Sequence, residues 1–347
     1  MNISVAYALG AAALFGLSTP LAKALLGSVS PVLLGGLLYL GSGIGLMAAR
    51  LWRDKGWQPT GLKPGEWSWL AGAIFFGGVL GPVGLMLGLQ STAGSTASLL
   101  LNLEAVLTAV LAWVAFKENA DRRVVAGMLA IVAGGVILSW PGEGASVAKW
   151  NWGAGLIVLA CLCWAIDNNL TRKVSASDAL FIAGSKGLVA GSVNVSIAFA
   201  LGNAWPAWPV IGGAMVVGLL GYGISLVLFV LALRGLGTAR TGAYFSVAPF
   251  VGALVSLLWL GDSVGPGFWA ACALMALGVW LHLTERHEHE HTHEPMEHTH
   301  AHVHDEHHQH AHDFVWDMQE PHAHEHKHTA MTHKHPHFPD IHHRHVH

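Results

Sequence analysis

Charged residues are scarce in this chain. Lys, Arg, Asp and Glu make up 11% of its 347 residues, whereas hydrophobic residues make up 53%. Soluble domains carry about 25% charged residues, so the composition excludes an ordinary soluble protein. Histidine is missing from the first 281 residues, and all 24 histidines lie at or beyond His282. We therefore expect a membrane domain followed by a soluble tail.

The sequence also lacks the motifs of several function classes. It has no GxxxxGK[ST] loop for nucleotide phosphates, which argues against ATP-driven chemistry by this chain alone. It has no basic cluster interleaved with aromatic residues, so we expect no nucleic-acid partner. No catalytic triad or fixed metal cluster is visible, and we expect that the protein is not an enzyme.

Long apolar runs dominate the first 283 residues instead. A hydrocarbon core needs about 20 residues of helix. Ten segments qualify, namely residues 3–26, 32–51, 67–89, 94–116, 122–140, 152–172, 178–201, 208–232, 238–260 and 265–283. The sequence thus predicts an all-α integral membrane protein with ten transmembrane helices, whose first partner is the lipid bilayer.

Lys and Arg are concentrated in the loops on one side of the predicted bundle. Eleven lie in the loops after the second, fourth, sixth and eighth spans, whereas the opposite loops contain only Lys149. Positively charged loops are retained in the cytoplasm. We therefore expect a multi-pass protein of the cytoplasmic (inner) membrane, with both termini and the tail in the cytoplasm.

The two halves of the apolar region share a pattern. Residues 88–138 and 232–281 each run from a small polar helix start, through an apolar helix and an acidic turn, to a glycine-bearing helix. Five helices per half is an odd number, so the second half is inverted relative to the first. The sequence predicts repeats at residues 1–141 and 150–283 and a tail at 284–347. The aligned pairs include Glu118 and Asp262, and Gly134 and Gly278, at an offset of 144, and Ser18 and Asp167 at an offset of 149.

This pattern resembles the drug/metabolite transporter superfamily, in its EamA-type ten-helix group, over about residues 3–283. That group has an apolar helix with an internal Pro, an acidic residue about 13 positions later, and a closing glycine-containing helix. The matching positions are Pro249, Asp262 and Gly278 in the second copy and Glu118 and Gly134 in the first. Ala105 replaces the Pro of the first copy, so we expect that helix to be less kinked. The resemblance implies secondary transport, often export, and does not identify the substrate.

Polar and ionisable residues within the spans form the candidate transport site, because each costs several kcal/mol in lipid unless it is paired or hydrated. The candidates are Glu104, Lys186, Asp167, Asn168, Asn102 and Tyr244. We expect Glu104 and Lys186 to face a cavity between the repeats, where the acid exchanges protons and the amine attracts an anion or holds the acid ionised. Structural pairing of Glu104, pairing of Asp167 with Arg172, and packing of the Tyr244 ring remain open alternatives.

The tail repeats a His-x-His pattern with too few hydrophobic residues for a core, so we expect it to be disordered without a ligand. Imidazole suits Zn, Ni, Co and Cu, and we expect several exchangeable metal ions rather than one fixed site. A pH-sensitive polyelectrolyte and neutral sequence drift are the alternatives. The candidate metal ligands are His287, His289, His291, His293, His298, His300, His302, His304, His307, His308, His310, His312, His322, His324, His326 and His328.

Together these features predict a permease that moves a small metabolite or amphipathic compound by alternating access, with no cofactor for transport. Two alternatives follow from the tail. The protein is a transition-metal transporter for Ni, Co or Zn, or it is a permease that the tail regulates as a metal sensor. The lack of histidine before residue 282 argues against the first alternative.

Overall fold

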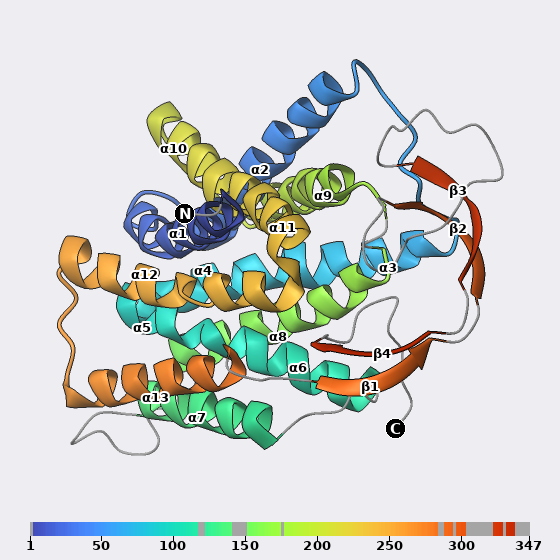
Figure 1. Ribbon diagram of the computed structural model, residues 1–347. Helices are drawn as coiled ribbons and strands as arrows, with labels where there is room; N and C mark the ends of the chain where they lie inside the picture. The colour runs from blue at the N-terminus through green and yellow to red at the C-terminus, as the bar shows by residue number, and fades with distance from the viewer. Residues whose placement is uncertain are drawn as a thin grey trace. The chain divides into compact units, whose positions relative to one another are not determined.

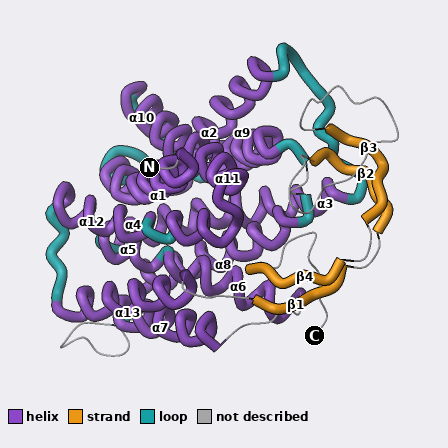
Figure 2. Tube along the Cα trace, in the orientation of Figure 1, coloured by secondary structure: helices purple, strands orange, loops and turns teal. Residues whose placement is uncertain are grey.

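The computed structural model describes residues 3–116, 122–140, 151–174 and 177–283 of one compact unit, which spans Met1–Glu285. A second unit, Arg286–His347, is described at residues 288–293, 296–302, 322–328 and 331–336. The motif residue Glu118 lies outside the described residues. Figures 1 and 2 show that the described part of the first unit consists of helices and connecting loops, and that of the second of strands.

The helices follow the predicted spans closely. The first repeat contains α1 (Ile3–Leu25), α2 (Pro31–Arg53), α3 (Glu66–Ala73), the π-helical turn η1 (Ile74–Leu80), α4 (Gly81–Ser91), α5 (Gly94–Leu100), α6 (Asn102–Phe116) and α7 (Arg122–Ser139). The second contains α8 (Trp152–Arg172), α9 (Ala179–Ala200), α10 (Trp208–Gly218), η2 (Leu219–Ile224), α11 (Ser225–Phe245), α12 (Ala248–Val255), η3 (Ser256–Leu260) and α13 (Pro266–Leu283).

Most helices of this unit are long enough to span a membrane. Eight helical stretches among the described residues are long and apolar enough to cross a bilayer, and two shorter apolar helices, Ala248–Leu260 and Pro266–Leu281, follow them. This confirms the predicted all-α membrane fold. One boundary differs, because α11 continues through the break expected at residues 233–237. Gly235 and Gly237 weaken a helix by only about 1 kcal/mol each, and no Pro stops it there.

The last helices of the two repeats, α7 and α13, meet through their motif glycines. A Cβ atom on Gly134 would lie 3.0 Å from the carbonyl oxygen of Ala271, and one on Gly278 would lie 2.6 Å from that of Gly127. Positions 127 and 271 are themselves counterparts at the offset of 144. Each glycine therefore contacts the same position of the other helix, which is the reciprocity of a two-fold relation between inverted repeats.

Both repeats interrupt the helix that carries the motif's Pro position. In the second copy the break lies at Ser246–Val247, and Pro249 stands in the first turn of α12. In the first copy α5 and α6 are separated at Leu101, although this copy has no Pro. Asn102 donates a hydrogen bond from its amide to the carbonyl oxygen of Leu99 at 3.0 Å, which satisfies a backbone group at this break. The helix of the first copy is therefore interrupted even though it lacks the Pro.

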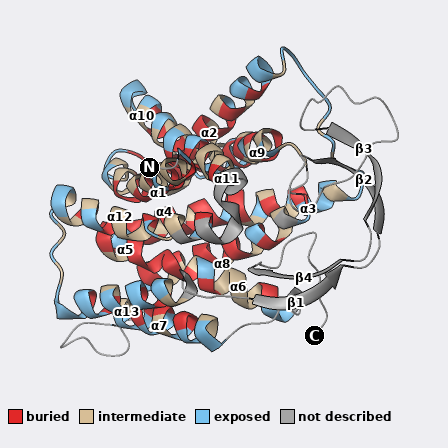
Figure 3. Ribbon diagram, in the orientation of Figure 1, coloured by how far each residue is buried: buried red, intermediate tan, exposed pale blue. Residues whose placement is uncertain are grey.

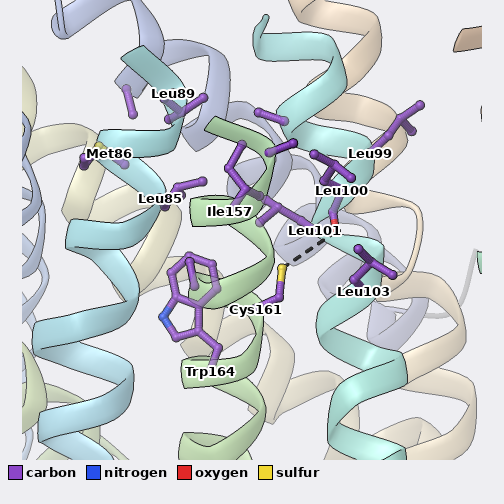
Figure 4. Close-up of a cluster of buried hydrophobic side chains, with 14 of the residues drawn as sticks. Leu85, Met86, Leu89, Leu99, Leu100, Leu101, Leu103, Ile157, Cys161 and Trp164 are labelled. Carbon is purple, nitrogen blue, oxygen red and sulfur yellow. Dashed lines mark hydrogen bonds between the residues drawn. The ribbon is translucent and has the colours of Figure 1, made fainter. Parts of the chain in front are cut away.

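The core of the helical unit lies where α8 runs between α4 and the α5–α6 pair (Figure 4). Its leucines and Ile157 are buried, and the Cys161 thiol donates to the carbonyl oxygen of Leu100 at 3.7 Å. Figure 3 shows buried residues concentrated on α4, α5 and α8, with exposed ones at the tips of α10 and α12. This packing fixes which side of α8 faces each neighbour.

The described part of the tail consists of short strands. Strand β1 (Glu288–His293) pairs with β4 (Met331–Pro336), and β2 (Met296–His302) pairs with β3 (His322–His328), both antiparallel. Alternation of His with other residues has the period of two that suits a strand. Two-stranded ribbons are marginally stable in water, and the tail has too few hydrophobic residues to build a core around them.

Candidate functional site

A largely buried ion pair joins α8 and α9. The Lys186 Nζ atom lies 2.6 and 2.7 Å from the two carboxylate oxygens of Asp167. One helical turn further along α8, the Thr171 hydroxyl donates to Asp167 Oδ1 at 2.8 Å, and Lys186 also donates to Thr171 Oγ1 at 3.3 Å. A buried pair needs such extra hydrogen bonds to offset the loss of water. The two side chains and the hydroxyl thus form a closed, charge-balanced group.

The turn η1 supports this group from the first repeat. A Cβ atom on Gly77 would lie 1.9 Å from Asp167 Oδ2, so only glycine fits beside the carboxylate. The carbonyl oxygen of Gly77 accepts hydrogen bonds from Tyr39 Oη at 2.7 Å and from Trp164 Nε1 at 2.9 Å. A π-helical turn interrupts the regular pattern of backbone hydrogen bonds in a helix. The two side chains supply hydrogen bonds to a carbonyl oxygen that lipid could not provide.

Glu104 lies beside this group but has a different partner. Asn168 donates from Nδ2 to Glu104 Oε1 at 2.9 Å and to Thr108 Oγ1 at 3.3 Å, which links α8 to α6. Glu104 is half-buried and Asn168 is exposed. The charge of Lys186 acts on Glu104, yet the direct contact of Lys186 is with Asp167. The acid of the first repeat is therefore held by a neutral amide.

Aromatic rings surround the same region. The Tyr39 and Tyr222 ring centroids are 5.6 Å apart, those of Phe15 and Tyr222 are 5.9 Å apart, and those of Phe15 and Phe245 are 5.5 Å apart. These rings come from α1, α2, η2 and α11, so helices of both repeats meet beside the Gly77 carbonyl oxygen that accepts from Tyr39.

The structure brings together four of the six candidate transport residues, Glu104, Lys186, Asp167 and Asn168. Asn102 is buried at the start of α6, where its amide also lies 3.8 Å from the sulfur of Met275 on α13. Tyr244 is half-buried on α11 and takes part in none of the described hydrogen bonds of the group. The sequence analysis missed Thr171 and Gly77. Thr171 lies four residues after Asp167 on α8 and so reaches its carboxylate, and Gly77 matters because α8 approaches η1 there.

A second ionic cluster lies at the ends of α2 and α9. Asp178 Oδ2 accepts from Arg50 Nε at 2.8 Å and from Arg53 Nη2 at 2.6 Å, and Asp178 Oδ1 accepts from the Leu180 amide at 2.9 Å, which caps α9. Burial opposes the charge of Asp178, but the hydrogen bonds from Arg53 and Arg50 outweigh it and hold the pKa of Asp178 below its ordinary value. The fully buried Arg50 guanidinium also lies 5.4 Å from the Phe181 ring. Sequence analysis used these arginines only to predict orientation.

The motif acid of the second copy contacts the first copy. Asp262 Oδ2 accepts a hydrogen bond from the Ser95 amide in the first turn of α5 at 2.8 Å. Lys23 donates from Nζ to the carbonyl oxygen of Leu89 at the end of α4, and the charge of Asp262 acts on it. Asp262 therefore stabilises the junction between the repeats.

The tail ligands divide into two groups. His287, His304, His307, His308, His310 and His312 lie outside the described residues, and the remaining ten candidates lie in β1, β2 and β3. In the β2–β3 ribbon, His298, His300 and His302 are the register partners of His326, His324 and His322. No group of three or more potential metal ligands occurs among the side chains that the structure describes.

Comparisons with known proteins agree with this architecture. The model of the EamA-like transporter family matches residues 2–140 and 151–284. A relative described as an uncharacterized transporter, from Methanothermobacter thermautotrophicus, is 28% identical over 262 residues, which cover 72% of this chain and 76% of the relative. A crystal structure that is 20% identical matches with a TM-score of 0.59 over 80% of this chain and 94% of its own, which is a likeness of fold. Both helical halves match the family model, and the chain belongs to the EamA-like transporter family.

Proposed function

We propose that this protein is a secondary-active permease of the cytoplasmic membrane, with both termini in the cytoplasm, and that it moves a small polar or amphipathic metabolite by alternating access. The observation that supports this most directly is the polar group formed by Glu104 on α6 with Asn168, Asp167 and Lys186 on α8 and α9. These residues come from both repeats, and transporter sites lie where repeats meet.

Proton coupling at Glu104 is part of the proposal. Ionisable residues inside membrane spans are costly and mark ion or substrate pathways. Glu104 accepts a hydrogen bond from a neutral amide and forms none of the described ion pairs. It can therefore gain or lose a proton without breaking a salt bridge, whereas Asp167 cannot.

Flux measurements with purified protein in vesicles test this proposal. We expect Glu104→Gln and Lys186→Met to abolish transport at unchanged expression, because one loses the exchangeable proton and the other leaves Asp167 without its cation. Glu66→Gln and Lys63→Met are matched controls, since Lys63 lies in the exposed connection before α3, Glu66 is the first residue of α3, and neither belongs to the polar group. Full flux in both site variants would refute the assignment.

Metal binding by the tail is a second proposal, favoured by the register of its ribbons. Opposed residues of an antiparallel pair have Cβ atoms about 4.5–5.5 Å apart, and three His–His pairs follow one another along β2 and β3. Neutral imidazoles at such spacing suit Zn, Ni, Co or Cu. We propose that bound metal either is buffered near the transporter or regulates it.

Removal of residues 284–347 separates these roles. If the tail is a sensor, metabolite flux should lose its dependence on added Ni or Zn. If the protein itself transports metal, metal accumulation in vesicles should change and metabolite flux should be absent. Unchanged metal binding by the truncated protein, measured by isothermal titration with Zn, would refute a role of the tail in binding.

A further inference from the structure

Two short helical segments from different repeats lie against each other, namely α5 and the continuous stretch of α12 and η3 at residues 248–260 (Figure 1). A Cβ atom on Gly94 would lie 2.7 Å from the hydroxyl oxygen of Ser256, and one on Gly252 would lie 2.7 Å from that of Ser98. The segments therefore run antiparallel in close contact, because the later residue of one faces the earlier residue of the other. We call this contact the α5–α12 seam.

The seam buries hydroxyl groups that lack hydrogen-bond partners. Ser95 and Ser256 are 0% exposed, Ser98 is 1% exposed, and Thr92, which precedes α5, is 3% exposed. None of their hydroxyl oxygens has a partner among the residues that the structure describes. A buried hydroxyl group without a partner is costly, and lipid offers it none. A contact that stayed closed would therefore be more stable with alanine at these positions.

The contact between α7 and α13 shows that close packing by itself does not need hydroxyl groups. There Gly134 meets Ala271 and Gly278 meets Gly127, and none of these residues carries a hydroxyl. Small residues of this kind are enough to let two helices approach closely in a membrane. The hydroxyls of the α5–α12 seam need a further reason, and contact with water in another state of the protein supplies one.

Each side of the seam is also separated from the rest of its span by a break. α5 ends before Leu101, and the break at Ser246–Val247 precedes α12. Glu104 lies three residues beyond Leu101, so the seam lies between Glu104 and the end of this span. At that end the half-buried Asp262 accepts the hydrogen bond from the Ser95 amide at 2.8 Å, which joins the two sides.

We propose that the α5–α12 seam is a gate of the transport path, that the Asp262–Ser95 contact holds it closed in this structure, and that its hydroxyl groups are hydrated when it opens. This rests on the proposed transport function. The breaks in both repeats let the two sides separate without unfolding α6 or α11. Opening then admits water and solute from the membrane surface at Asp262 toward Glu104.

Labelling of single cysteines in the full-length protein in nanodiscs tests the gate without a known substrate. The probe is a charged methanethiosulfonate, which reacts with thiols that water reaches. We expect Ser98→Cys to react, and Ser42→Cys, at a buried position of α2 outside the seam, to remain unlabelled. Ser263→Cys, at an exposed position after Asp262, is the positive control. The native protein gives the background of its own cysteines, Cys161, Cys163 and Cys272.

Loss of the Asp262 carboxylate should speed this labelling. We expect Asp262→Ala to raise the labelling rate of Ser98→Cys by about tenfold, because a charge-assisted hydrogen bond across the seam is lost. Glu66→Ala is the matched control, since Glu66 also accepts a backbone hydrogen bond at 2.8 Å, from the Lys63 amide, but lies outside the seam. Equal labelling of Ser98→Cys and Ser42→Cys, or a rate that Asp262→Ala leaves unchanged, overturns the inference.

A disulfide across the seam separates failure of the gate from failure of the permease. A Cβ atom on Gly94 would lie 3.3 Å from that of Ser256, and disulfides join Cβ atoms about 3.5–4.5 Å apart. We expect the oxidised double variant Gly94→Cys, Ser256→Cys to lose flux of leucine, uridine and glycerol 3-phosphate, used as probes in vesicles, and dithiothreitol to restore whichever flux the native protein shows. Each single-cysteine variant should keep that flux.

The two measurements then give distinct outcomes. Native flux in the oxidised double variant overturns the gate and leaves the permease. Labelling of Ser98→Cys that depends on Asp262, with no flux of any probe through the native protein, supports the gate and contradicts the permease. The absence of both contradicts both.

Discussion

The two ends of the helical unit are built on the same geometry with different chemistry. At one end α8 packs on η1 through Asp167 and Gly77, and at the other α1 packs on η2 through Ser18 and Gly221. A Cβ atom on Gly77 would lie 2.6 Å from the Cβ of Asp167, and one on Gly221 would lie 2.6 Å from the Cβ of Ser18. The two contacts therefore have the same backbone spacing but different side chains.

The neighbours of these pairs differ in the same way. At the offset of 149, the fully buried Leu37 and Ala22 occupy the positions of Lys186 and Thr171. The ionic cluster of Arg50 and Asp178 likewise has the apolar counterparts Phe199 and Val29. At these positions one end is therefore held by ion pairs and the other by hydrophobic packing, so the first should respond more strongly to pH and salt. The predictions below are ordered by their expected effect on stability.

Removing one charge from the ionic end should have the largest effect. Asp167→Ala leaves the largely buried Lys186 without its charged partner, and we expect a loss of about 3–5 kcal/mol in unfolding free energy. Ser18→Ala removes only a hydroxyl that donates to the carbonyl oxygen of Phe15, and should cost about 1 kcal/mol. Chemical denaturation in detergent measures both. An equal loss in the two variants would show that the charge is not what distinguishes the ends.

Adding a methyl group at Gly77, where α8 approaches η1, should have the next largest effect. Gly77→Ala places a methyl group against the Asp167 carboxylate, and we expect about 1–3 kcal/mol of destabilisation together with lost flux. Gly212→Ala on α10 is the matched control, because nothing lies within 4 Å of its added methyl. Melting temperature and flux should fall in the first variant and remain native in the second. Native behaviour of Gly77→Ala would contradict the close approach of α8 to η1.

Acid should weaken the ionic end through Asp178. The pKa of Asp178 is lower in the folded protein than in the unfolded chain, where Asp titrates at about 3.9. Its contribution is therefore complete above that pH and is lost as the pH falls through the folded pKa. We expect Asp178→Asn to reduce the loss of unfolding free energy on acidification by about 1–2 kcal/mol.

Asp54→Asn is the comparison for this effect, since the Asp54 carboxylate contacts Arg53 but, unlike that of Asp178, accepts none of the described hydrogen bonds from the first turn of a helix. Stability measured at several pH values should change less in that variant. If Asp178→Asn kept the native pH dependence, the Arg50–Asp178 contact would not support the fold.

Grafting the apolar end onto the ionic end should have the smallest effect on stability. The triple variant Asp167→Ser, Thr171→Ala, Lys186→Leu replaces a buried ion pair by hydrophobic residues, which is often neutral or stabilising by about 1–4 kcal/mol. We expect a native melting temperature but no flux. Native flux in this variant would mean that the ion pair belongs to the scaffold and has no part in transport.

Much of the fold was predictable because it depends on local properties. Span lengths follow from apolar runs, and the repeats follow from the spacing of acids and glycines. The break before Glu104 was not, since Ala105 gives no sign of it and the interruption at Leu101 relies on Asn102. The continuity of α11 through Gly235 and Gly237 was missed for a similar reason, because glycine permits a turn without requiring one.

The candidate site was predictable as a set of residues but not as a set of pairs. The sequence identified Glu104, Lys186, Asp167 and Asn168 because polar residues inside spans are costly wherever they face. It associated Lys186 with Glu104 and left open a pairing of Asp167 with Arg172, whereas the structure pairs Asp167 with Lys186. Which polar residues meet depends on the rotation of α6, α8 and α9 about their axes.

The sequence by itself determined that this chain is a helical membrane protein with two related halves, because bilayer thickness and backbone hydrogen bonding leave few alternatives. The tertiary structure alone decided that Lys186 is taken by Asp167 and that Glu104 remains available. That outcome depends on Gly77, whose missing side chain lets α8 approach η1 and places the carboxylate within reach of α9. Contacts between helices fix such pairs, and no local pattern in the chain records them.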